Sequence, residues 1–161
     1  MEAKYGEAVK AGIFGGILAA ILFVAVILIG IYWTDVTWFT LGEFACWVLL
    51  AGVMLLTGVL AVGWSRERFA NIDEAALGAS LAGGLAGFIG ALVFALAVAV
   101  TQFFIGYDFL AGMGRFEVLA VRSSLSLICG SAACFLLPVI MLAGIILAAI
   151  GGWIYWLATR K

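Results

Sequence analysis

Histidine is absent from this sequence of 161 residues, and charged residues make up only 11% of it. Without imidazole groups, the chain cannot form bis-histidine haem or the usual imidazole metal sites, and it lacks the commonest general base of enzymes. The scarcity of charge leaves too little polar surface for a water-soluble domain of this size, because 67% of the residues are hydrophobic. We therefore expect an integral membrane protein.

Clustered basic residues and paired cysteines are missing as well. The net charge is −1, and no run of lysine and arginine is long enough for a nucleic-acid footprint, so nucleic acid is excluded as a partner. Cys46, Cys129 and Cys134 lack the CxxC spacing of a metal or redox site. We expect buried, inert thiols, with a disulfide from Cys46 to the last apolar run as the alternative, and no metal or cofactor.

What the sequence does contain is four apolar runs free of Asp, Glu, Lys and Arg: residues 11–33, 44–64, 77–106 and 125–158. Each run reaches the ~20 residues that a helix needs to cross a bilayer. The runs predict an all-α integral membrane protein with one transmembrane domain over residues 1–161 and spans at about 9–33, 42–64, 75–106 and 125–158. The last two runs extend about 45 and 51 Å at 1.5 Å per residue, so these helices must tilt or project.

Two features modify the last two spans. Pro138, the only proline, should free the carbonyl of Cys134 and kink the fourth span. We expect a packing kink, with a hinge or an ion-coordinating carbonyl as the alternative. Between Leu110 and Ser123, apolar and charged residues alternate at helical spacing, which predicts a short outer interfacial helix. The alternative is a docking surface for an extracytoplasmic partner.

The charged residues between the runs indicate the orientation. If the amino terminus is cytoplasmic, six of the eight cationic residues lie inside: Lys4, Lys10, Arg66, Arg68, Arg160 and Lys161. Only Arg115 and Arg122 then lie outside. Because short loops rich in lysine and arginine stay on the cytoplasmic side, we expect a multi-pass protein of the cell membrane with both termini cytoplasmic.

The two halves of the chain resemble each other. The matching segments are Gly15-Gly16 with Gly83-Gly84, Ala45-Cys46-Trp47 with Ala133-Cys134-Phe135, and Met54-Leu55 with Met141-Leu142. This similarity predicts two tandem parallel two-helix repeats, related by an axis along the membrane normal. The inverted-repeat architecture of many transporters would then not apply.

Small residues recur at every fourth position of the first and third runs: Ala11, Gly15 and Ala19, and Ala75, Ala79, Gly83, Gly87, Ala91, Ala95 and Ala99. Such rows let helix backbones approach closely in lipid. We expect a seam between the first and third spans, with a contact between copies as the alternative. A shorter row in the fourth span, formed by Gly144, Ala148 and Gly152, is predicted to face a partner.

The polar residues suggest no chemistry. No carboxylate is expected near the bilayer midplane, which argues against coupled transport, and no reactive constellation points to an enzyme. We expect a non-catalytic subunit or scaffold of a membrane complex, in contact with membrane lipid and with other membrane subunits or further copies of itself. The alternative is a channel or facilitator for a small neutral solute, lined by Thr57, Thr101, Gln102 and the serines.

The predicted topology can be tested by single-cysteine labelling in a background without the native thiols. Cysteines at positions 4, 66 and 161 should react with a membrane-impermeant reagent from one side, and cysteines at positions 35 and 115 from the other. Labelling of positions 35 and 66 from the same side would contradict the four-span topology.

Overall fold

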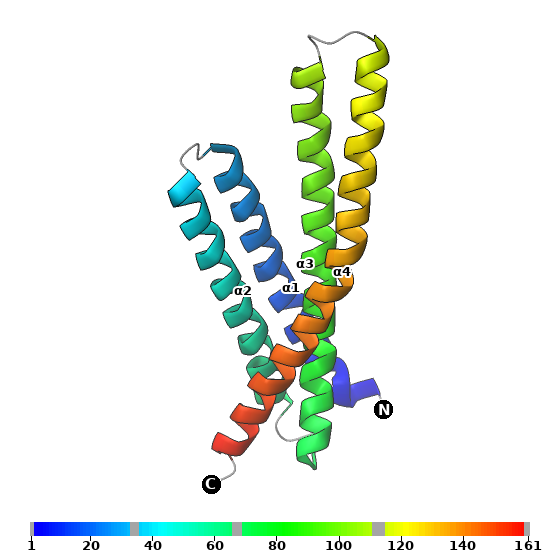
Figure 1. Cartoon of the computed structure of the whole chain (residues 1–161). Helices are drawn as coiled ribbons and strands as arrows, with labels where there is room; N and C mark the ends of the chain where they lie inside the picture. Colours follow the sequence, from blue (N-terminus) through cyan, green and yellow to red (C-terminus); the bar gives the residue numbers. More distant parts are fainter. Residues whose placement is uncertain (1, 33–35, 66–68, 111–114, 160–161) are drawn as a thin grey trace.

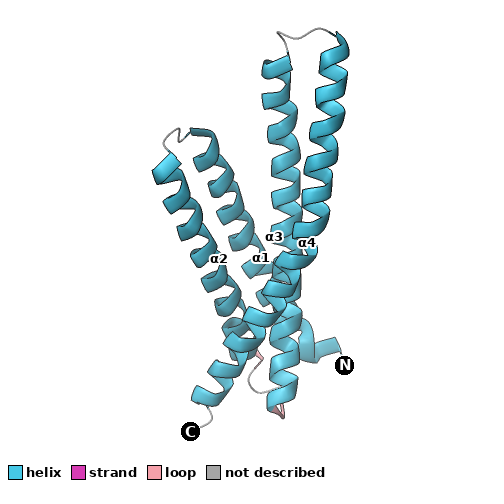
Figure 2. Cartoon of the chain, in the orientation of Figure 1, coloured by secondary structure: helices cyan, strands magenta, loops and turns pink. Residues whose placement is uncertain are grey.

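Four long α-helices make up the computed structural model: α1 (Glu2–Tyr32), α2 (Val36–Trp64), α3 (Ile72–Leu110) and α4 (Arg115–Thr159) (Figures 1 and 2). It describes the backbone of residues 2–32, 36–65, 69–110 and 115–159, and the side chains of residues 5–25, 28, 44–65, 69–97, 99–100 and 136–159. No strand occurs over these backbone ranges. Each helix contains a segment long and apolar enough to cross a membrane, as the four apolar runs predicted. The prediction of an all-helical fold is confirmed, and the four segments suggest a multi-pass membrane protein.

The helices form two hairpins, α1–α2 and α3–α4, that pack together at one end and separate toward the other (Figure 1). Both termini lie at the packed end (Figure 1). The helices α3 and α4 pack along each other, α1 packs on α3, and α2 packs on α4. The α3–α4 hairpin extends well beyond the loop of the α1–α2 hairpin (Figure 2), as the length of its apolar runs requires.

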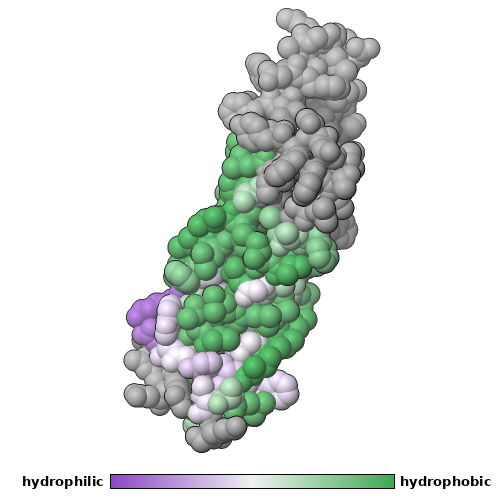
Figure 3. All heavy atoms as spheres, turned by 90° about the vertical axis from the view of Figure 1, so that its left-hand side faces the viewer, coloured by the Kyte–Doolittle hydropathy of each residue, from purple (hydrophilic) through white to green (hydrophobic). Residues whose placement is uncertain are grey.

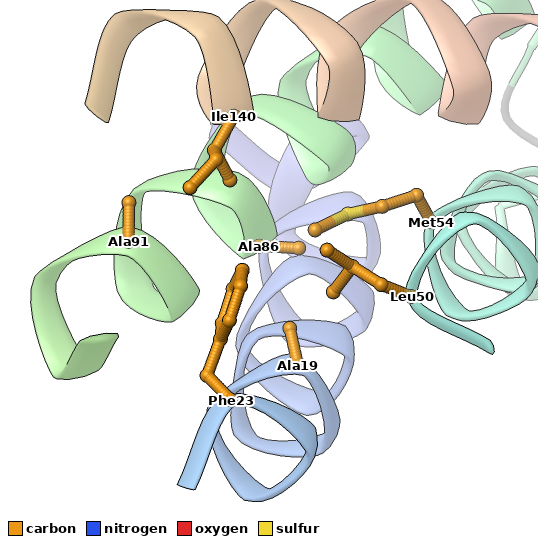
Figure 4. Close-up of a cluster of buried hydrophobic side chains, with 7 residues drawn as sticks. All are labelled: Ala19, Phe23, Leu50, Met54, Ala86, Ala91 and Ile140. Atoms are coloured by element: carbon orange, nitrogen blue, oxygen red, sulfur yellow. The ribbon is translucent and has the colours of Figure 1, made fainter. Parts of the chain in front are cut away.

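The buried core fills the packed end and stops partway along the bundle. Its last buried residues toward the open end are Phe23, Cys46, Ala91 and Ile140, one from each helix. Beyond them, every side chain that the structure describes is at least partly exposed. Figure 4 shows residues of all four helices converging just inside this limit: Ala19, Phe23, Leu50, Met54, Ala86, Ala91 and Ile140.

An aromatic side chain from the α2–α3 connection closes the packed end. Phe69 is only 5% exposed, and its ring lies where a side chain at Gly78 would stand. The centroid of this ring is 6.3 Å from that of Tyr5 on α1, and Trp156 of α4 belongs to the same cluster. The connection therefore joins the core instead of lying on its surface.

Local hydrogen bonds hold this connection against the start of α3. The backbone N–H of Ala70 donates to Oε2 of Glu74 at 3.0 Å, and the N–H of Ala75 donates to the carbonyl of Asn71 at 3.1 Å. A glutamate that reaches back across the first turn in this way satisfies a backbone donor ahead of the helix, as in a capping box. The start of α3 and the position of Phe69 are thus fixed together.

The outer end of α4 corrects one prediction from the sequence. A separate short helix was expected between Leu110 and Ser123, but residues 115–123 form the first turns of α4 and continue into it without a break. No glycine or proline occurs between Arg115 and Ile128, so nothing in this segment interrupts the backbone hydrogen bonds of the helix. Residues 111–114, which were also part of the predicted outer helix, lie outside the described backbone.

Pro138 lies inside α4, which remains one helix through it. Figure 1 shows α4 changing direction near its middle, in the orange part of the ribbon. A proline removes one intrahelical hydrogen bond and its ring displaces the preceding turn, which explains a bend at this level. Whether the bend moves, as a hinge would, stays a prediction.

The role of Phe69 can be measured by comparing Phe69→Ala with Phe88→Ala. Loss of the buried Phe69 ring should lower the free energy of unfolding by on the order of 3 kcal/mol, because it leaves a cavity beneath Gly78 and Tyr5. Phe88 is 42% exposed on α3, so the same truncation there should cost less than about 1 kcal/mol. Denaturant unfolding in detergent micelles gives both values. Equal losses would show that Phe69 does not belong to the core.

Candidate functional site

The described interior holds almost no polar side chains. In the part of the chain whose side chains are placed, no group of three or more His, Cys, Asp or Glu residues could hold a metal ion. The buried polar side chains there are Thr57 and Ser65. The Thr57 hydroxyl donates to the carbonyl of Val53 at 2.8 Å, within its own helix. What distinguishes the interior is therefore the approach of helix backbones.

The backbones of α3 and α4 approach each other closely at a pair of glycines. A Cβ atom placed on Gly83 would collide with the carbonyl oxygen of Gly144, and one placed on Gly144 would lie 2.6 Å from the carbonyl oxygen of Gly83. Each Cα therefore faces the other helix's carbonyl with no side chain between them. This arrangement allows reciprocal Cα–H···O contacts and a dense dispersion contact between the two backbones.

The same contact continues along both helices. A Cβ on Gly87 would lie 3.0 Å from the Cα of Met141, one turn toward the open end. In the other direction, a Cβ on Gly152 would lie 2.5 Å from the Cβ of Ala79, which is fully buried. The seam between α3 and α4 is therefore lined by small residues over about two turns of each helix.

The helix α4 also meets the backbone of α2. A side chain on Gly58 would overlap the carbonyl of Ala148, and one on Gly151 would overlap the carbonyl of Leu55. Figure 1 shows the carboxyl-terminal half of α4 crossing the bundle. At this crossing, α4 touches the backbones of two helices at once, so only small residues fit on both of its faces.

The helix α1 packs through three glycines. A Cβ on Gly12 would lie 2.8 Å from the carbonyl oxygen of Ala82, and one on Gly16 would lie 2.8 Å from the Cβ of Ile89, both on α3. Gly15 instead faces α2, where a Cβ would collide with the side chain of Thr57. Gly15 and Gly16, which are adjacent in the sequence, thus pack against two different helices, α2 and α3.

These contacts correct the predicted neighbour of the small residues that recur at every fourth position of α3. The sequence analysis paired the row with the first span, but Gly83 and Gly87 lie against α4. A row of every fourth residue turns by about 40° per step around a helix of 3.6 residues per turn, so it cannot stay on one partner. Ala91 is still buried, at 2% exposed, whereas Ala99 near the end of the row is exposed.

The prediction for the fourth span is corrected in the same way. Gly144 and Gly152 were expected to face a partner, but both are buried within the chain against α3. The glycines at the crossings that sequence reasoning missed include Gly12, Gly58 and Gly151. The Gly12-xxx-Gly16 spacing is the one signal that could have found the first of them.

Several predicted polar positions fall in the part of the chain whose side chains are not described: Thr101, Gln102, Ser126, Ser131, Cys129 and Cys134. Cys46 is a buried free thiol. Thr57, proposed from sequence as a pore-lining residue, is 1% exposed and bonded within its own helix. No protein-family model matches this chain, and no curated protein or solved structure matches it significantly.

The glycine contact between α3 and α4 can be tested with a single methyl group. Gly83→Ala should lower the free energy of unfolding by on the order of 1–3 kcal/mol, because the added Cβ must push the carbonyl of Gly144 away. Gly52→Ala is the matched control, since nothing lies within 4 Å of a Cβ at this exposed position. There, alanine should be neutral or stabilising by up to about 1 kcal/mol. Equal effects of the two substitutions would refute the close approach.

The contact between Gly15 and Thr57 differs from the one between Gly83 and Gly144, because Gly15 faces a side chain and not a backbone carbonyl. Gly15→Ala should be destabilising alone, by on the order of 1–2 kcal/mol, and less so when combined with Thr57→Gly, which clears the space. A double-mutant cycle of unfolding free energies measures this coupling. Additive effects would mean that the two residues are not in contact.

Proposed function

We propose that this chain is a non-catalytic subunit or scaffold of a membrane protein complex, inserted in the cell membrane with both termini on the cytoplasmic side. The observation that carries the proposal is the kind of residue that fills the interior of the bundle. Its crossings are filled by backbone contacts at glycine and alanine, and its buried polar groups in the described part are limited to Thr57 and Ser65. Such an interior supports assembly and rigidity more than chemistry.

The outer surface supports the same proposal. Each helix exposes large apolar side chains, with Ile21 at 60%, Phe44 at 69%, Leu96 at 58% and Val139 at 60% exposed. In water, contiguous apolar surface of this kind would drive association, whereas in a bilayer it is covered by lipid or by neighbouring helices. Membrane lipid and other membrane subunits are therefore the partners that we propose.

The distribution of charge supports the proposed orientation. Lys10 and Glu7 form an ion pair of 2.9 Å near the packed end of the bundle, and Asp73 lies in the first turn of α3 at that end. Figure 3 shows hydrophilic surface gathered toward this end and apolar surface beyond it. The excess of lysine and arginine in the segments of the sequence at this end then favours the cytoplasm as its compartment.

We also propose that the two hairpins are tandem repeats. The alignment of Gly15 with Gly83, and of Met54 with Met141, places Thr57 opposite Gly144 when it is continued by three residues. The structure pairs these positions in the same way, since Gly15 faces Thr57 and Gly83 faces Gly144. An equivalent contact in each hairpin supports a common origin more strongly than the sequence match alone.

The channel alternative receives no support from the described interior. The Thr57 hydroxyl is already bonded to the carbonyl of Val53, and the cluster around Phe69 and Trp156 at the packed end is hydrophobic. A conducting path needs polar groups or carbonyls along a continuous opening. We therefore do not advance a second function.

Affinity purification of the full chain from its native membranes in mild detergent tests the subunit proposal. We expect a partner that remains at a fixed stoichiometry through gel filtration, and purified chain alone in liposomes should show no flux of glycerol or urea above empty liposomes. An unrelated four-span protein with the same tag is the control for adventitious capture. A chain that purifies without any stoichiometric partner and conducts either solute would overturn the proposal.

A further inference from the structure

We draw no further inference here: the strongest candidate, the apolar groove of about 750 Å³ on the exposed face of α3 between Val9 of α1 and Met141 of α4, carries nothing because nothing in the structure shows whether lipid, a second copy or a partner helix covers it.

Discussion

The contact between the backbones of α3 and α4 at Gly83 and Gly144 is the constraint on which the rest of the bundle depends. Because these helices touch without intervening side chains, α4 can also lie against α2 at Gly58 and Gly151. A larger residue at any of these positions would move α4 outward and separate it from one of its two neighbours. The position of α4 in turn encloses the core residues Met54 and Ile140.

Glycine inside a helix costs about 1 kcal/mol relative to alanine, so its repeated use at the crossings requires a compensating gain. Lipid tails are as apolar as leucine side chains, and helices in a bilayer therefore gain little from hydrophobic burial. Close backbone contact supplies dispersion and Cα–H···O interactions in its place. The crossings are thus filled by backbone and small side chains, while the large apolar side chains lie on the outer surface.

The sequence was sufficient to predict the number of helices, because each apolar run is long and the charged residues fall between the runs. It also identified Gly83, Gly87 and Gly144 as residues that permit close packing. It could not identify their neighbours, because the neighbour of a face depends on how the helices rotate and cross, and a row of every fourth residue winds around its own helix. It likewise gave no sign that Phe69, in a short connection, would enter the core, since that depends on the space above Gly78.

Disulfide cross-linking in membranes tests the central contact most directly. With the native cysteines replaced, Ala79→Cys and Gly152→Cys should form an intramolecular disulfide rapidly under mild oxidation. Their Cβ positions are 2.5 Å apart, and a shift of about 1 Å reaches the spacing that a disulfide requires. Ala79→Cys paired with Ala143→Cys, on the exposed face of α4, should remain reduced under the same conditions. Equal cross-linking of both pairs, or of neither, would contradict the proposed approach of α3 and α4.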